Sequence, residues 1–336
     1  MKSYYPEMGF DCASEREINE ALPILGGPSK IIYAQPCKKS EDIKVAQARG
    51  VSLTVADSVE EIEKLAEAGW GGEVAVRLLV GDSGSKQPFG KKFGAPKEWL
   101  PDMYKAAAFH KLNMVGHSFH VGSECMDPVQ YKSAIIDCKK AEELARKYNF
   151  RSTLVDIGGG FVPDKAKFAA IAAQVSEAIK IHYDDPAVRV IAEPGRFLAA
   201  PSHTLYTTVI GKKPVWPPPS SAAEPKWRIT IDESVYGTFS NIPFDGQKPA
   251  LERVRPLKSG ESVRPTVVFG RTCDSGDLIS ADALLPELEV GDVLRVRDMG
   301  AYTTVTASEF NGFPRPNKIY VESDVEVVTP RRVQMA

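Results

Sequence analysis

Short apolar strands alternate with amphipathic helices from Gly9 to Val190, and this alternation limits the fold more than any other feature of the sequence. The predicted strands cover Gly9–Ala13, Ile31–Ala34, Val51–Ala56, Val74–Val80 and Met114–His120, and two more begin at Leu154 and Val190. Strands separated by helices favour a parallel sheet, because a parallel connection needs a crossover segment. About seven strand–helix steps are one short of a (β/α)8 barrel. We therefore expect the first barrel strand to lie before Met1.

The residues at the helix ends support these boundaries. Ser14 with Glu17 three residues later is a capping-box pattern, which is typical of a helix start. Helices are also predicted over Ser40–Arg49, Ser58–Ala68, Trp99–Leu112, Pro128–Tyr148 and Lys165–His182.

The composition argues against several classes of protein. The net charge of −2 gives no support for a nucleic-acid partner or for a membrane surface. No apolar run approaches the roughly 18 residues of a membrane span. The five cysteines are odd in number, scattered and without C-x-x-C spacing. They indicate reduced thiols in a cytoplasmic protein, and neither they nor the histidines predict a metal site.

The pattern changes after Arg196. Thr204–Ile210 reads as a strand, and residues 214–226 form a proline-rich loop that cannot be helical. Short alternating segments then predict antiparallel strands at Trp227–Asp232, Pro265–Phe269, Val293–Arg297, Thr303–Thr306 and Lys318–Val321. We therefore predict an α/β domain over residues 1–200 and an antiparallel β domain over residues 201–336.

Two pieces of sequence between Leu154 and Phe197 carry most of the chemistry. In L-V-D-I-G-G-G-F a buried strand is followed by Gly158, Gly159 and Gly160, and a glycine turn there lets backbone N–H groups approach a phosphate. In V-I-A-E-P-G-R-F, Glu193 and Arg196 follow another strand. Taken singly, the pieces fit a tight turn and a surface ion pair equally well. Together they favour a phosphate-bearing cofactor with an acidic partner for its ring.

The order of the motifs resembles that of the ornithine decarboxylase family, the fold-type III enzymes that use pyridoxal 5'-phosphate (PLP) on basic amino acids. The resemblance runs from about Gly9 to Val321 and rests on G-F-D-C-A-S, Y-A-Q-P-C-K, S-F-H-V-G-S, D-I-G-G-G-F, A-E-P-G-R-F, G-R-T-C-D and M-G-A-Y-T. It implies an alanine-racemase-like (β/α)8-type barrel followed by a β-barrel domain.

The resemblance also implies roles around the cofactor. His120 would stack on the pyridine ring, and Glu193 would keep the ring nitrogen protonated. Asp11 and Arg77 would line the same pocket. The implied phosphate contacts are Ser123, Gly158, Gly159, Gly160, Arg196 and Tyr302.

The substrate end of the implied site lies in the second half of the chain. Cys273 matches the residue that returns a proton after carbon dioxide leaves, although a lone cysteine is also often a small core residue. Asp274 and Asp245 match carboxylates that bind the distal amine, with Tyr236 and Phe310 beside them. The family's cysteine loop reaches the partner subunit, so a head-to-tail homodimer with shared sites is expected.

Some positions depart from the family pattern. The lysine that carries the family's cofactor lies about twenty residues before the aspartate of G-F-D-C-A-S, and only ten residues precede Asp11 here. Lys38 belongs to the family's own P-C-K segment and is not that lysine. Glu124 replaces a small residue and would put a negative charge near the phosphate. We therefore expect PLP to be held non-covalently at best.

Three functions remain open at this point. The first is decarboxylation of an ornithine-like or lysine-like substrate. The second is a lysine-less enzyme without PLP, which would use Cys273, Asp274, His120 and Glu193 for acid–base chemistry. The third is a catalytically inactive homologue that binds a regulatory partner.

Overall fold

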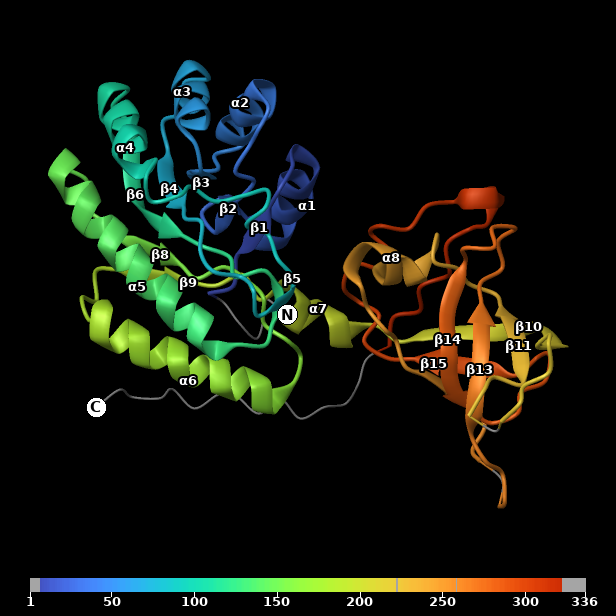
Figure 1. The fold of residues 1–336 in the computed structure, drawn as a ribbon. Helices are drawn as coiled ribbons and strands as arrows, with labels where there is room; N and C mark the ends of the chain where they lie inside the picture. The colour runs from blue at the N-terminus through green and yellow to red at the C-terminus, as the bar shows by residue number, and fades with distance from the viewer. Residues whose placement is uncertain (1–6, 222, 258, 322–336) are drawn as a thin grey trace. The chain divides into compact units, whose positions relative to one another are not determined.

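The computed structural model describes residues 7–221, 223–257 and 259–321, and it divides into two compact units (Figure 1). Within the described residues, unit 1 comprises 7–160, 166–193 and 319–321. Unit 2 comprises 161–165 and 194–318 without residues 222 and 258. Each unit has its own sheet. In the described part of the chain no helix is long and apolar enough to cross a membrane.

Unit 1 is built on a parallel sheet of seven strands in the order β1-β2-β3-β4-β6-β8-β9. Its strands are β1 (Phe10–Cys12), β2 (Ile31–Tyr33), β3 (Leu53–Ala56), β4 (Glu73–Arg77), β6 (Asn113–Ser118), β8 (Leu154–Asp156) and β9 (Arg189–Ile191). The prediction of a parallel sheet is confirmed.

Helices connect these strands and follow one another around the outside of the sheet (Figure 1). They are α1 (Glu15–Leu25), α2 (Ser40–Ala48), α3 (Val59–Glu67), α4 (Leu100–Phe109), α5 (Pro128–Ala145) with η1 (Arg146–Tyr148), and α6 (Lys165–His182). Side-chain caps start three of them: Ser14 Oγ accepts from Glu17 N at 3.3 Å, Ser58 Oγ accepts from Glu61 N at 3.2 Å, and Asp127 Oδ1 accepts from Val129 N at 3.0 Å.

The inward faces of the unit 1 strands pack on one another. Their shared core consists of branched and small side chains, as is usual inside a barrel of parallel strands: Ile32, Leu53, Val55, Ala75, Val115 and Leu154. A short antiparallel pair that the sequence did not predict, β5 (Ser85–Gln87) with β7 (Ser123–Cys125), joins the loop after β4 to the segment after β6.

Unit 2 contains a sheet of six strands in the order β12-β15-β10-β11-β13-β14. The strands are β10 (Leu205–Pro214), β11 (Trp227–Ile231), β12 (Leu251–Arg253), β13 (Arg264–Phe269), β14 (Leu278–Leu285) and β15 (Val293–Val296). Short helices are α7 (Gly195–Ala199), η2 (Ala200–Ser202), η3 (Thr238–Ser240), α8 (Asn241–Asp245) and η4 (Phe310–Gly312). Buried residues such as Val209, Ile231, Val268 and Leu294 form its core.

Several predictions for this half were wrong. The sheet is not purely antiparallel, because β11 and β13 run parallel. Pro214, assigned to the proline-rich loop, ends β10 and pairs with Trp227. Residues Thr303–Thr306 form a turn, in which Thr306 N donates to Thr303 O at 3.1 Å, and Lys318–Val321 is not a strand. Strands β12 and β14 and helix α8 were missed.

Candidate functional site

Four charged side chains of unit 1 gather where its parallel strands end. Arg77 ends β4, Asp156 ends β8, and Glu193 lies two residues after β9, while Asp11 belongs to β1. Carboxyl ends of parallel strands share one edge of a sheet, which explains why residues so far apart in sequence meet. Arg77 interacts electrostatically with Glu193, Asp11 and Asp156.

Burial raises the pKa values of the carboxyl groups in this cluster. The pKa of Glu193 lies well above its ordinary value because of burial and the neighbouring Asp156. The pKa of Asp11 is also well above its ordinary value, through burial and then through Glu193 and Glu17. Burial of these acids beside a single guanidinium thus favours the protonated forms of Glu193 and Asp11 over their ionised forms.

His120 follows β6 and presents a neutral imidazole to this cluster. Burial, and then the charge of Arg77, lowers the pKa of His120 to about 3. Its Nδ1 accepts a hydrogen bond from Gly122 N at 3.0 Å, so Nε2 carries the remaining hydrogen. The ring of Phe89 lies against it, with centroids 4.8 Å apart. Sequence reasoning found His120 but missed Phe89.

The glycine turn after β8 has no room for side chains. Gly158 and Gly160 have φ values of 61° and 97°, where other residues are strained. A Cβ on Gly158 would lie 2.1 Å from Phe119 O, and one on Gly159 would lie 2.8 Å from His120 Nε2. The turn therefore runs directly against the His120 segment, and Gly158 and Gly159 are buried there.

Ser123 and Glu124 belong to β7, beside the glycine turn. Cys125 N donates to Gly160 O at 3.0 Å, which ties β7 to that turn, and Ser123 is buried. Glu124 forms an ion pair with Lys86 of β5 at 3.2 Å. The negative charge that the sequence predicted near the phosphate therefore has a lysine partner, which sequence reasoning missed.

In unit 2 the predicted phosphate ligand Arg196 is paired with a predicted substrate ligand. Arg196 Nη2 donates to Asp245 Oδ2 at 2.6 Å, and both side chains are buried. The guanidinium also lies over the ring of Tyr302, 4.9 Å from its centroid. In this structure Arg196, Asp245 and Tyr302 form one cluster in which the charge of Asp245 is balanced.

The remaining predicted residues form a second cluster in unit 2. The hydroxyl of Tyr236 donates to Asp274, and the rings of Tyr236 and Phe310 lie 4.3 Å apart. The hydrogen bond from Tyr236 lowers the pKa of Asp274. Cys273 is exposed, and its backbone N–H donates to Asn311 Oδ1 at 3.1 Å.

Arg271, which precedes this cluster in sequence, points to another acid. Its guanidinium pairs with Asp232 at 2.9 Å and also donates to Pro314 O. The predicted residues therefore fall into three groups. Unit 1 holds the Glu193 group, which consists of Asp11, Arg77, His120, Ser123, Gly158, Gly159, Gly160 and Glu193. Unit 2 holds Arg196 with Asp245 and Tyr302, and separately Tyr236 with Cys273, Asp274 and Phe310.

The Glu193 group fits the ring and phosphate of PLP. It offers a protonated carboxyl group, a neutral imidazole, and a glycine turn whose backbone no Cβ shields. Lys38 offers no attachment point, because its amine is fully buried and bonds to Gln35 O, Val55 O and Glu61. Glu61 lies in α3, so this lysine holds the helix against the strands.

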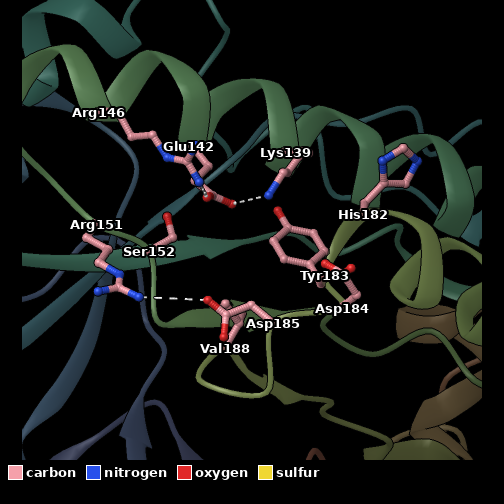
Figure 2. A pocket seen from close by; sticks show the side chains of 10 residues that line it. All are labelled: Lys139, Glu142, Arg146, Arg151, Ser152, His182, Tyr183, Asp184, Asp185 and Val188. Carbon is pink, nitrogen blue, oxygen red and sulfur yellow. Dashed lines mark hydrogen bonds and ion pairs between the residues drawn. The ribbon is translucent and has the colours of Figure 1, made fainter.

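A separate pocket of about 110 Å³ lies at the opposite edge of the unit 1 sheet, where the strands begin (Figure 2). Its charged side chains pair with one another: Glu142 with Lys139 at 3.3 Å and with Arg146, and Arg151 with Asp185 at 3.8 Å. The hydroxyl of Tyr183 in its lining is buried and has no hydrogen-bond partner in the described part of the chain. The pocket is not part of the Glu193 group.

Comparisons with known proteins agree with this geometry. Residues 7–200 match the family model described as the pyridoxal binding domain of pyridoxal-dependent decarboxylases. The probable ornithine decarboxylase of Dictyostelium discoideum is 39% identical over 322 residues, covering 94% of this chain and 69% of that protein. Antizyme inhibitor 2 of Xenopus laevis is 35% identical over 313 residues, with 91% and 69% covered.

Solved structures give the same result. The arginine decarboxylase of Paramecium bursaria Chlorella virus bound to agmatine has a TM-score of 0.85 and 33% identity, with 91% of this chain and 82% of that chain covered. The lysine/ornithine decarboxylase of Vibrio vulnificus complexed with cadaverine has a TM-score of 0.80 and 32% identity, with 94% and 82% covered.

Proposed function

The chain belongs to the family of pyridoxal-dependent decarboxylases that includes the ornithine decarboxylases, and we propose that it removes the carboxylate of a basic amino acid such as ornithine or lysine. The observation that carries this proposal is the Glu193 group. It combines a buried protonated carboxyl group, a neutral histidine and a bare glycine turn at one end of a parallel sheet. The names of the compared enzymes support the class of substrate.

Bound PLP would supply the electron-withdrawing ring that stabilises charge on the carbon losing carbon dioxide. Glu193 would bind the ring nitrogen, and His120 would cover the ring. Backbone N–H groups of Gly159 and Gly160 would bind the phosphate together with Ser123, while the N–H of Gly158 is held by Asp156. By family resemblance, Gly158, Arg196 and Tyr302 belong to the same phosphate site. Arg77 and Asp11 would balance the charge around the ring. In these 336 residues we expect the cofactor to be bound reversibly.

The second part of the proposal concerns substrate and assembly. Cys273 would return a proton to the reacting carbon, and Asp274 would bind the distal ammonium, with Tyr236 and Phe310 beside it. Asp245 would join Asp274 only when it is free of Arg196. By resemblance, Cys273 and Asp274 would serve the Glu193 group of a partner subunit in a cytoplasmic homodimer.

A regulatory homologue without activity is a second candidate. The similarity to antizyme inhibitor 2 favours it. A lysine-less enzyme that uses the same acidic pocket without PLP is a further alternative. Both alternatives differ from the main proposal in how the chain responds to PLP and to a basic amino acid.

Titration of the purified chain with PLP tests the cofactor proposal. Binding should quench protein fluorescence saturably, and borohydride treatment followed by dialysis should leave the cofactor removable. Glu193→Gln should weaken binding, whereas Glu98→Gln, which changes an exposed carboxylate paired only with Lys97, should leave it unchanged. A stable reduced adduct on a lysine of this chain would contradict reversible binding. Absence of binding would favour the alternative without PLP.

A further inference from the structure

Asp156 is a buried acid of the Glu193 group that the family resemblance did not assign. It ends β8, where its neighbours are β6 and β9, and only 1% of it is exposed. Its Oδ1 accepts a hydrogen bond from Gly158 N at 2.9 Å, so it anchors the first residue of the glycine turn. Its Oδ2 is buried. If all carboxyl groups are taken as ionised, no group in the described part of the chain donates a hydrogen bond to this oxygen.

Glu193 lies beside Asp156. Its backbone N–H donates to Gly158 O at 2.8 Å, which places Glu193 beside the residue that Asp156 anchors. The two buried side chains interact directly, because each shifts the pKa of the other through a side-chain hydrogen-bond contact. Two ionised carboxylates are acceptors only, so this contact requires a proton on one of them.

The charges around the pair favour keeping that proton. Asp11 adds a third carboxyl group, and Arg77 is the guanidinium that faces all three. His120 is neutral at physiological pH, and Cys138 of α5 approaches Asp156 as a thiol whose pKa is raised by burial. Further out, Glu17 acts on Asp11, and Asp57 acts on Arg77. A single guanidinium cannot balance three ionised acids in a buried site.

We propose that Glu193 carries a proton and donates it to Oδ2 of Asp156, which makes Asp156 a positioning residue for Glu193. Asp156 is the ionised member of the pair and is itself held by Gly158 N. The pair therefore links the acid that faces the ring position to the glycine turn that faces the phosphate position. It also stores a proton inside the site before any ligand arrives.

The direction of the pH effect follows from the raised pKa of Glu193. The unfolded chain loses this proton near the ordinary value of 4.5, whereas the folded chain keeps it to higher pH. The stabilisation is complete below pH 4.5 and is lost as the pH rises through the folded pKa. One such proton changes the folding equilibrium constant by up to about tenfold per pH unit in this window.

Denaturant unfolding of the ligand-free chain between about pH 5 and 8 tests the pair without cofactor or turnover. Its outcome is therefore independent of the proposed reaction. In Glu193→Gln the amide still donates to Asp156 but has no titratable proton. The slope of the free energy of unfolding against pH should therefore decrease by the amount that corresponds to about one proton. Asp156→Asn should also reduce it, and the control Glu98→Gln should not. A Glu193→Gln variant with the full wild-type slope would overturn the proposal.

Infrared spectroscopy of the wild-type chain keeps the proposal testable if these variants do not fold. A protonated carboxyl group has a C=O stretching band that is distinct from the bands of a carboxylate, and this band shifts in heavy water. Because Asp11 also holds a proton, the decisive sample is Asp11→Asn, in which the band of Glu193 should remain at pH 7. A spectrum of that variant without any carboxylic-acid band would overturn the proposal.

Discussion

Asp245 and Asp274 are both acids of the proposed substrate end, but their surroundings differ. Asp245 is buried against Arg196 at 2.6 Å, so its charge is already matched. Asp274 accepts from the neutral hydroxyl of Tyr236, and that bond lowers its pKa. Arg271, the nearest cation in sequence, is held by Asp232 instead. Asp274 therefore stays ionised with a charge that an ammonium group could satisfy.

Asp274→Asn should weaken the binding of ornithine-like or lysine-like ligands at least tenfold and leave neutral analogues nearly unchanged. A hydrogen bond to a charged group is typically worth about 1.5–3 kcal/mol, which corresponds to at least tenfold in affinity. Calorimetry with both ligand classes measures the difference. Asp282→Asn, which changes an exposed acid of β14 in the same unit and outside the proposed site, is the matched control. Equal weakening of both ligand classes would show that Asp274 does not recognise charge.

The residues of the Glu193 group show what sequence can and cannot supply. The family resemblance located Asp11, Arg77, His120 and Glu193, and the structure places each of them in a strand or within two residues of its end. The resemblance did not find Asp156, although D-I-G-G-G-F contains it, since its role depends on an oxygen that only the folded chain buries. The pairing of Arg196 with Asp245 was equally hidden, because 49 residues separate the two.

At the level of elements, the glycine turn links strand β8 of the parallel sheet to the Glu193 group. Its three residues approach Phe119 O, His120 Nε2 and Gly122 O more closely than any side chain would allow. The hydroxyl of Tyr131 in α5 donates to Gly159 O at 2.9 Å and fixes the turn from the helix side. The turn is therefore held by close packing, by Tyr131 and by the bond from Gly158 N to Asp156, and the N–H groups of Gly159 and Gly160 are the proposed ligand contacts.

Gly158→Ala should destabilise the chain and abolish PLP binding. The added Cβ would lie 2.1 Å from Phe119 O, and a φ of 61° is itself strained for alanine, which costs roughly 1–3 kcal/mol before any clash is relieved. Denaturant unfolding and a PLP titration measure the two effects. Gly81→Ala, where the new Cβ would meet nothing within 4 Å, should change neither. Normal PLP binding by Gly158→Ala would contradict the role of the turn.

The elements of unit 1 were predictable, and several elements of unit 2 were not. Most unit 1 strands are short apolar runs followed by a helix, and side-chain caps mark the starts of α1, α3 and α5, so periodicity and capping residues identify these elements. In β14 the register against β13 shifts near Val268, which breaks the period-two pattern that sequence analysis needs. Thr303–Thr306 has the residue types of a strand, but Thr303 Oγ1 donates to Met299 O and favours a turn.

For the whole molecule, the proposed assembly can be tested by mixing inactive chains. If Cys273 serves the Glu193 group of a partner subunit, Cys273→Ala and Glu193→Ala chains should complement each other. Random assortment into dimers gives each mixed dimer one intact site, so activity should return on mixing to a substantial fraction of the wild-type value. Each variant mixed with itself is the control. No recovery from a mixture that forms dimers would contradict shared sites.

The central claim is that this chain decarboxylates a basic amino acid with PLP held in the Glu193 group. Its most direct test is the release of carbon dioxide from ornithine labelled in its carboxylate, measured with the purified chain and added PLP. We predict that the wild-type chain with PLP releases carbon dioxide faster than free PLP does. Glu193→Gln and Cys273→Ala should each lower the rate of the wild-type chain at least tenfold. Release no faster than with free PLP, from a chain that binds PLP saturably, would contradict the central claim and favour the regulatory homologue.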